Sequence, residues 1–355
     1  MADAGMNSFA KRLLQWWEGH GRHDLPWQLE RTPYRVWVSE IMLQQTQVVT
    51  VIGYFQRFMA RFPTLADLAQ AELDEVLALW SGLGYYARAR NLHASARICV
   101  DQHGGELPED AQALEALPGI GRSTAHAILA QAWNRRAPIL DGNVKRVLAR
   151  HAGVEGWPGR SMILQRLWQE ADARTPNHRA ADYTQAIMDL GAGMCTPRKP
   201  ACLLCPVQAD CRARMDDRID ELPARKPARQ RPHRQTTMLI LRDTSGRILL
   251  TRRPPSGIWG GLWCLPEACG DAGSGIAETF EIHPEPNREI APIAHQFTHF
   301  SLTLYFINAQ HHIDSKHLGE NTNRWFELDD ALAAGLPRPI RAVLEQLREA
   351  RDGAN

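Results

Sequence analysis

The sequence has no apolar run long enough to cross a membrane. Its longest uncharged segment, residues 41–55, falls short of the roughly 20 apolar residues that span a bilayer and is interrupted by Gln44, Gln45, Thr46 and Gln47. The first nine residues carry an aspartate and no apolar core, so a secretory signal is not expected. We therefore predict a protein of the reducing cytoplasm, without a membrane partner and without disulfides.

An excess of charge of either sign is also missing. Lys and Arg number 41 and Asp and Glu 40, for a net charge of +1, which taken alone argues against a nucleic-acid partner. The charge is unevenly placed, however: residues 1–220 carry about +1, residues 221–253 about +7 and residues 254–355 about −7. The basic, proline-spaced residues 222–235 are either a solvated linker or a segment that lies along a phosphate backbone.

Hydrophobic periodicity divides the chain into two domains. With 44% apolar and 23% charged residues, collagen-like and disordered classes are excluded and two cores can form. Apolar residues recur at three- and four-residue spacing as far as about residue 213, which predicts an all-α domain over residues 1–221. After the linker at 222–235, alternating segments and a final helix at 339–348 predict a smaller α+β domain over residues 236–355.

Cysteine is scarce, with seven residues, but four of them fall within 17 positions: Cys195, Cys202, Cys205 and Cys211. A cluster of this kind in a reducing compartment is typical of a metal site. Structural zinc sites usually pair two closely spaced cysteine knuckles, and only one is present. The mixed spacing favours one 4Fe-4S cluster held by four thiolates, with a structural or redox-responsive role. We assign no role to Cys99, Cys264 and Cys269.

A glycine-containing turn joins two helical stretches at residues 117–124. Its backbone N–H groups can form an anion nest at the N-terminus of the second helix, which predicts a phosphate-binding hairpin; a turn that only closes a corner is the alternative. The predicted hairpin residues are Leu117, Pro118, Gly119, Ile120 and Gly121. The segment is neither a P-loop nor a dinucleotide fingerprint, so no nucleotide cofactor is expected.

Further motifs accompany the hairpin and the cysteine cluster. They are LPW at 25–27, SEIMLQQTQ at 39–47, GLGYYARARNL at 82–92, ILDGNVKR at 139–146 and RPPSGIWGGLW at 253–263. These features together resemble the iron–sulfur DNA glycosylases of the helix-hairpin-helix superfamily, and within them the MutY-type adenine DNA glycosylases with a Nudix-like C-terminal domain. The resemblance extends over nearly the whole chain. It implies removal of adenine mispaired with 8-oxoguanine or guanine in double-stranded DNA, which leaves an abasic site.

Adenine release needs a protonated leaving base and an anion beside a cationic sugar, so one acid and one carboxylate are sought. Glu40 shares a predicted helix face with apolar residues, where desolvation raises the pKa of a carboxyl group. The resemblance implies that Glu40 protonates the base and later helps to activate water. Asp141 precedes a helix and on residue type alone is an N-cap. By resemblance it is the second carboxylate, either as an ion or as a covalent partner of the sugar, supported by Asn143.

Ser123 decides the subclass within the resemblance. Bifunctional relatives similar to endonuclease III carry at this position a lysine that forms a Schiff base, and a serine hydroxyl cannot do so. We therefore expect base removal without an efficient lyase step. The rival predictions are an endonuclease III-like pyrimidine glycosylase and lyase, and a non-catalytic iron–sulfur DNA-binding protein.

A base inside a duplex must be flipped out before it can react. By resemblance, Gln45 and Tyr85 enter the base stack. Further correspondence gives an adenine pocket of Trp27, Leu43, Ser123, Gln185 and Met188. Candidate phosphate contacts on helices are Arg88, Arg90, Lys145, Arg146 and Arg150.

The C-terminal domain resembles a Nudix-like reader of 8-oxoguanine. The carboxylate-rich motif with which pyrophosphohydrolases bind magnesium is missing, so we expect no catalytic magnesium. The recognition loop is Phe297, Thr298 and His299, where the family commonly has serine in the middle. A second departure is His126, where a small residue is common. We expect a monomer associated with the nucleoid; a sliding-clamp or mismatch-repair partner cannot be derived from the residues.

Overall fold

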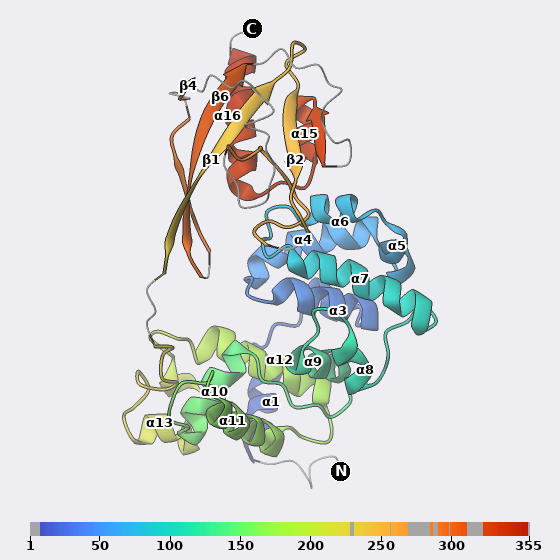
Figure 1. Cartoon of the computed structure of the whole chain (residues 1–355). Coiled ribbons are helices and arrows are strands. Elements are labelled where there is room, and N and C mark those ends of the chain that lie inside the picture. Colours follow the sequence, from blue (N-terminus) through green and yellow to red (C-terminus); the bar gives the residue numbers. More distant parts are fainter. Residues whose placement is uncertain are drawn as a thin grey trace. The chain divides into compact units, whose positions relative to one another are not determined.

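The computed structural model describes residues 8–227, 231–255, 257–268, 285–286, 290–297, 299–310 and 322–353. The chain forms two compact units (Figure 1). Met1–Gln70 and Asn91–Ala228 make the first, and Ala71–Arg90 and Arg229–Asn355 make the second. The predicted fold class, an all-α domain followed by a smaller α+β domain, is confirmed. No helix in the described ranges is both long and apolar enough to span a membrane.

The first unit is built of amphipathic helices around an apolar core. Its N-terminal helices are α1 (Ser8–His20), α2 (Pro26–Leu29), α3 (Pro33–Leu43), α4 (Val48–Arg61) and α5 (Leu65–Gln70). Then follow α7 (Ala87–Gln102), which begins in the second unit, and α8 (Ala111–Ala116), α9 (Arg122–Trp133), α10 (Gly142–Ala152), α11 (Ser161–Arg174) and α12 (Ala180–Asp189).

The cysteine-containing segment consists of short turns. The π-helical turn Leu190–Met194 continues α12, the 3₁₀ turns Cys202–Leu204 and Gln208–Asp210 follow, and α13 (Arg212–Met215) closes the segment. One core cluster joins it to the helices: Leu13, Trp17 and Leu148 are buried together, with Cys195 and Cys205 packed at the edge. Burial of each large apolar side chain contributes about 1.5–3 kcal/mol to stability, so the helices fix the base on which the cysteine segment lies.

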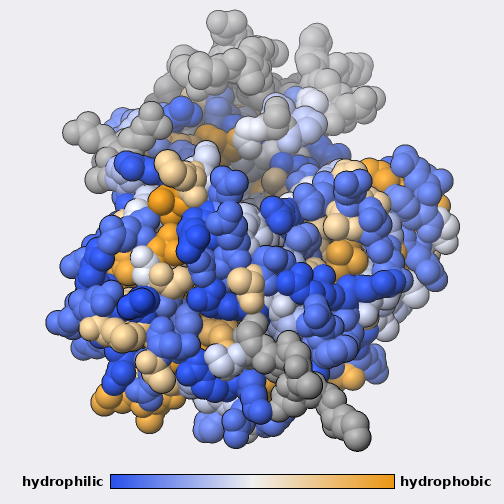
Figure 2. Space-filling model, turned by 90° about the horizontal axis from the view of Figure 1, so that it is seen from below, coloured by the Kyte–Doolittle hydropathy of each residue, from blue (hydrophilic) through white to orange (hydrophobic). Residues whose placement is uncertain are grey.

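Several large hydrophobic side chains of the described residues are exposed, among them Leu29, Val49, Met162, Leu203 and Met215. On the face drawn in Figure 2, hydrophobic areas are small and set among hydrophilic side chains. Single exposed apolar residues are common on folded proteins and indicate no binding surface by themselves.

The second unit contains a mixed sheet with strand order β3-β2-β1-β6-β4, in which β5 also pairs with β6 and β7 with β2. The long strands β1 (His233–Arg242) and β6 (Ser301–Gln310) run parallel, with His233 opposite Ser301. Figure 1 shows α16 behind this sheet. Other elements of this unit are β2 (Ile248–Arg252), β3 (Trp263–Cys264), β4 (Glu285–Pro286), β5 (Ile293–Gln296), β7 (Asn323–Phe326), α15 (Leu328–Ala333) and α16 (Arg338–Gly353).

The strand β1 begins earlier than the sequence predicts. The prolines assign residues 222–235 to a linker, but residues 233–235 pair with β6. The backbone N–H of Ser301 donates to the Pro232 carbonyl at 3.0 Å, which extends the contact one residue further. The Arg234 guanidinium lies 4.7 Å from the centre of the Phe300 ring. Arg234, the last basic residue of the predicted linker, therefore belongs to the strand β1.

Residues 71–90 belong by their contacts to the second unit, although the sequence places them in the all-α domain. This segment contains α6 (Leu73–Trp80) and the turn before α7. The Tyr86 hydroxyl donates to the Leu336 carbonyl at 2.9 Å, and an Arg341 nitrogen donates to the Ser81 hydroxyl at 3.1 Å. The contacts thus add two boundaries, before residue 71 and after residue 90, to the one predicted at residue 221.

Candidate active site and iron–sulfur segment

Glu40 lies near the end of α3, a helix whose start is fixed by two local features. Pro33 occupies the first turn, and the Thr32 side chain accepts a hydrogen bond from the Arg35 backbone N–H at 3.3 Å. Both suit a helix N-terminus. Val36 and Trp37, on the same face as Glu40, are buried. Burial raises the pKa of Glu40 from its ordinary value of 4.5 to about 7, as the apolar face predicts.

A glutamine that the sequence reasoning missed holds the Glu40 carboxyl group. Gln131 on α9 donates a hydrogen bond from its Nε2 to Oε1 of Glu40 at 2.6 Å. This bond lowers the pKa of Glu40, whereas the negative charge of Asp141 raises it. A signal was present in the sequence, because Gln131 is a polar residue on an apolar helical stretch, but the pattern did not tell which residue it meets.

Asp141 is the N-cap of α10, as its residue type predicts. Its Oδ1 accepts a hydrogen bond from the Val144 N–H at 2.7 Å. Burial raises the pKa of Asp141, and this effect is opposed by the backbone N–H groups of Val144 and Asn143 and by the positive charge of Arg146. N–H groups at a helix N-terminus favour the ionised carboxylate. The pair can therefore present an acid, Glu40, and an anion, Asp141.

Asn143 is fixed by an arginine that also reaches the cysteine segment. Its Oδ1 accepts from Arg146 Nη2 at 2.9 Å. The same guanidinium donates to the Gly191 carbonyl at 2.6 Å and to the Cys195 carbonyl at 2.7 Å. The sequence predicts Arg146 as a phosphate contact; its Nε and Nη2 donate within the protein, and phosphate binding stays a prediction. A Cβ atom on Gly191 would lie 2.7 Å from that of Asn143, so this close approach requires glycine.

Two side chains of α9 hold the segment that leads to Asp141. The Ser123 hydroxyl accepts a hydrogen bond from the Leu140 N–H at 2.9 Å. Nδ1 of His126 is 2.7 Å from the Pro138 carbonyl, and its ring meets Trp168 edge to face. The unusual histidine thus has a structural role here. The residue that Ser123 binds directly precedes the candidate anion, so this serine supports the backbone beside it.

The predicted hairpin is a rigid turn. Gly119 has φ +80°, and a Cβ atom there would lie 2.9 Å from Asn91, so only glycine fits without displacement. Leu117 and Ile120 are buried. Gly121 caps α9 and, having no side chain, leaves the first N–H groups of that helix without a side-chain cap. These donors are oriented as an anion site requires; phosphate binding remains a prediction.

Gln45 and Tyr85 share an unusual backbone conformation. Their φ angles are +58° and +51°, which non-glycine residues seldom adopt and which cluster at functional sites. Gln45 is exposed, and Tyr85 is 49% exposed. Gln45 follows α3 in the first unit and Tyr85 precedes α7 in the second. Both side chains are available to a partner, and their insertion into a base stack stays a prediction.

The residues predicted for the adenine pocket differ in exposure. Trp27 and Gln185 are buried, whereas Leu43, Ser123 and Met188 are partly exposed. Trp27 meets Phe55 edge to face.

The amide of Gln185 is engaged by its own helix. Its Nε2 donates to Asp189 Oδ1 at 2.7 Å, and the same carboxylate accepts from Trp17 and from Arg22. Asp189 is buried and paired with the Arg22 guanidinium. A role for Gln185 in the pocket therefore remains a prediction, and contact with a base would use its carbonyl oxygen or the second N–H of Nε2.

Three of the other four predicted phosphate contacts on helices, all arginines, also donate within the protein. Arg150 is buried and donates to the Thr196 carbonyl at 2.7 Å and to the Leu222 carbonyl at 2.9 Å. Arg90 donates to the Gly260 carbonyl at 2.5 Å, and Arg88 to the Gly84 carbonyl at 3.1 Å. These guanidinium groups fix loops of the protein. The sequence could not predict these contacts, because every residue has a backbone carbonyl group and residue type does not show which one an arginine meets.

The four clustered cysteines line one pocket. Its wall also includes the apolar side chains of Val147, Leu190 and Met194. Thiolates around an apolar cavity suit an iron–sulfur cluster, whose ligands are cysteine sulfurs. The Arg150 guanidinium lies 3.4 Å from the Cys195 sulfur and supplies positive charge beside the ligands. In the described part of the chain, no three His, Cys, Asp or Glu residues are grouped around a single ion position.

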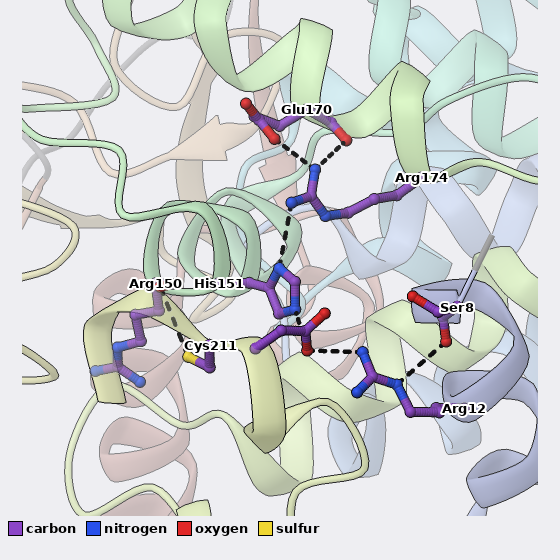
Figure 3. Close-up of polar contacts among 8 residues, drawn as sticks. Ser8, Arg12, Arg150, His151, Glu170, Arg174 and Cys211 are labelled. Carbon is purple, nitrogen blue, oxygen red and sulfur yellow. Dashed lines mark hydrogen bonds and ion pairs between the residues drawn. The ribbon is translucent and has the colours of Figure 1, made fainter. Parts of the chain in front are cut away.

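A chain of polar contacts anchors the cysteine segment to three helices (Figure 3). Asp210, next to Cys211, accepts from Arg12 of α1 at 2.6 Å and lies 3.2 Å from His151 of α10. The other nitrogen of His151 lies 3.2 Å from Arg174 of α11. Burial lowers the pKa of His151. These contacts hold the backbone around Cys211 in place.

The predicted 8-oxoguanine loop forms a tight aromatic turn. The Phe297 N–H donates to the Phe300 carbonyl at 2.9 Å, and the two rings stack with centroids 4.6 Å apart. His295 and Trp259 border Phe297. His299 is exposed, whereas Thr298 lies outside the described residues. The turn therefore offers flat aromatic surface beside an exposed imidazole.

Three family models match the chain in the order of its parts. The HhH-GPD superfamily base excision DNA repair protein model matches residues 38–172, the iron–sulfur binding domain of endonuclease III matches residues 195–211, and the NUDIX domain matches residues 237–346. The first range contains Glu40, Gln131 and Asp141, and the second contains all four cavity cysteines. The iron–sulfur assignment of the cysteine segment, expected from its spacing, is confirmed and takes precedence over zinc.

Named relatives cover nearly the whole chain. The adenine DNA glycosylase of Buchnera aphidicola (subsp. Acyrthosiphon pisum) is 36% identical over 96% of this chain and 98% of its own length. The human adenine DNA glycosylase is 35% identical over 84% of this chain and 66% of its own. Among solved structures, a thermostable thymine-DNA glycosylase is 28% identical, with a TM-score of 0.52 over 59% of this chain and 95% of its own.

A structure of endonuclease III in a non-covalent complex with DNA has a TM-score of 0.51 at 22% identity, over 59% of this chain and 94% of that one, and shares the fold of the helical part. Full-length similarity distinguishes the chain from that relative, because the adenine DNA glycosylases also match its second domain. The chain is therefore a member of the adenine DNA glycosylase family, an enzyme family of base excision DNA repair.

Proposed function

We propose that this protein removes adenine mispaired with 8-oxoguanine or guanine from double-stranded DNA by hydrolysing the N-glycosidic bond. The observation that carries the proposal is the carboxyl pair. Glu40 has a pKa of about 7, raised by burial and by the charge of Asp141. An acid poised near the working pH gives efficient proton transfer. Asp141 lies at a helix N-terminus that favours its ionised form.

The reaction places different demands on the two groups. Glu40 in its protonated form donates a proton to the adenine ring, which makes the base a better leaving group. As the bond breaks, positive charge develops on the sugar, and the Asp141 carboxylate stabilises it electrostatically. Glu40, now ionised, can accept a proton from the attacking water. The iron–sulfur cluster supplies a structural or redox-responsive element when bound. The residues that would hold it are Cys195, Cys202, Cys205 and Cys211.

The hydroxyl of Ser123 supports hydrolysis without strand cleavage. It accepts a hydrogen bond from the Leu140 N–H, and a hydroxyl has no amine with which to form a Schiff base. The product is therefore an abasic site. Gln45 and Tyr85 fill or wedge the stack when the base is flipped out, and the loop at residues 297–299 reads the base on the opposite strand.

A panel of end-labelled duplexes tests this proposal. Adenine is placed opposite 8-oxoguanine, guanine or cytosine, and each product is divided into an untreated and an alkali-treated sample. We expect alkali-dependent breaks at adenine opposite 8-oxoguanine and guanine, and almost none opposite cytosine. Breaks without alkali, or a stable protein–DNA adduct after borohydride reduction, would contradict the monofunctional reaction. Equal cleavage opposite cytosine would contradict mispair selection.

A further inference from the structure

Gln131 is a polar residue on a buried face of α9. It is 5% exposed, and Ala127, Ile128 and Ala130 around it are 1%, 0% and 0% exposed. Placing an amide in such surroundings is costly unless its polar atoms have partners. The partner of Nε2 is Oε1 of Glu40, 2.6 Å away on α3. Packing does not require this residue, because an apolar side chain of similar volume would fill the same space.

The hydrogen bond makes the two oxygens of Glu40 unequal. The charged or hydrogen-bonding groups that act on this carboxyl are Gln131 from α9 and Asp141 from the start of α10. Oε1 of Glu40 already accepts a hydrogen bond from the N–H of Gln131. When Glu40 takes up a proton of its own, that proton is favoured on Oε2.

We propose that Gln131 is a positioning residue for the acid step, which directs the transferable proton of Glu40 to Oε2. This inference rests on the proposed function, in which Glu40 is the acid. Gln131 does not touch the base or the sugar; it acts through the orientation and protonation of Glu40. An enzyme without the amide retains the acid but allows its proton to occupy either oxygen.

A change in pH dependence distinguishes this role from simple packing. The hydrogen bond from Gln131 favours the carboxylate and lowers the pKa of Glu40. Removing it moves the basic limb of the rate profile upward by about one to two pH units, the shift that follows from losing a hydrogen bond to a charged group. The maximum rate falls by up to about twofold, because the proton is divided between two oxygens.

The experiment compares single-turnover adenine release from an A:8-oxoguanine duplex between about pH 5 and 9 for the wild type, Gln131→Met and Thr175→Val. Methionine keeps the volume of glutamine and lacks the donor. Thr175→Val removes another buried hydrogen bond, from the Thr175 hydroxyl to the Ala171 carbonyl, away from Glu40. We expect the limb to move only in Gln131→Met. If that variant does not fold, Gln131→Leu replaces it. If the folded variant keeps the basic limb of its rate profile at the wild-type pH, the proposal is wrong.

Glu40→Gln separates this inference from the proposed function. If Glu40→Gln retains the wild-type rate, Glu40 is not the acid and both proposals fail. If Glu40→Gln loses base release while Gln131→Met keeps the wild-type pH profile, only the role of Gln131 is refuted. A limb that moves equally in Thr175→Val also refutes it, because loss of stability alone would then explain the shift.

Discussion

Replacing Asp141 by asparagine separates its two roles, helix cap and catalytic anion. Asn and Asp cap helices about equally well, so the hydrogen bond from the Val144 N–H, now 2.7 Å long, can be kept while the charge is lost. Asp141→Ala removes both. Loss of the cap costs about 0.5–2 kcal/mol, which lowers the melting temperature by about 2–4 °C per kcal/mol in a domain of this size.

The expected activities follow from the charge and not from the cap. Without an anion to stabilise the sugar cation, both variants should lose at least about 100-fold in single-turnover rate. Asp141→Asn should melt within about 2 °C of the wild type, whereas Asp141→Ala should melt lower. The negative charge of Asp141 also raises the pKa of Glu40, so any residual activity of Asp141→Asn should have its basic limb at lower pH.

The assay combines thermal unfolding followed by circular dichroism with base release from an A:8-oxoguanine duplex at enzyme excess. A cap without a catalytic role predicts that Asp141→Asn retains the wild-type rate and that Asp141→Ala loses activity only in proportion to unfolding. Either result would refute the assignment of Asp141 as the anion. Asn143→Ala is a useful comparison, because it changes the same helix start without removing a carboxylate.

The remaining predictions concern Glu40, the iron–sulfur segment and the linker. Glu40→Gln should abolish base release but leave duplex binding in a gel-shift assay largely unchanged. Because the pKa of Glu40 rises on folding from 4.5 to about 7, its contribution to stability is present below pH 4.5 and lost as the pH rises to about 7; the pH dependence of unfolding should therefore be weaker in Glu40→Gln, and an identical dependence would count against the raised pKa. Purified protein should show the broad visible absorption of an iron–sulfur cluster and lose it in Cys202→Ser, whereas stoichiometric zinc without this absorption would contradict the cluster. In the linker, Arg225, Arg229, Arg231 and Arg234 are to be replaced by glutamine. The slope of log affinity against log salt should then decrease by about 0.9 for each phosphate that the protein no longer neutralises. An unchanged slope would identify a linker without DNA contacts.

Local chemistry was readable from the sequence, and partners across the fold were not. The apolar face around Glu40 predicted the direction of its pKa, because the neighbours at helical spacing are fixed by the helix itself. The N-cap at Asp141 was predictable for the same reason. Gln131 was not, because the residue that a buried amide meets depends on how α3 packs against α9.

Arginine shows the limit most clearly. The sequence predicted Arg146 and Arg150 as phosphate contacts. Both guanidinium groups donate to backbone carbonyl groups of the protein, and the sequence does not indicate which carbonyl groups lie near a basic residue on a helix. The start of β1 was missed at His233 because parallel pairing with β6 is a long-range contact. Positive φ angles at Gln45 and Tyr85 were equally hidden, since neither residue type favours that conformation.

The membership of residues 71–90 in the second unit has a practical consequence for protein engineering. Leu77 lies 3.2 Å from the position of a Cβ atom on Gly335, and Arg252 pairs with Asp74. A fragment that ends at residue 227 would expose this apolar surface on α6 and remove the support of the turn that carries Tyr85. Chimeric enzymes that exchange C-terminal domains between relatives should therefore take residues 71–90 together with residues 229–355, although these two segments are not contiguous in the sequence.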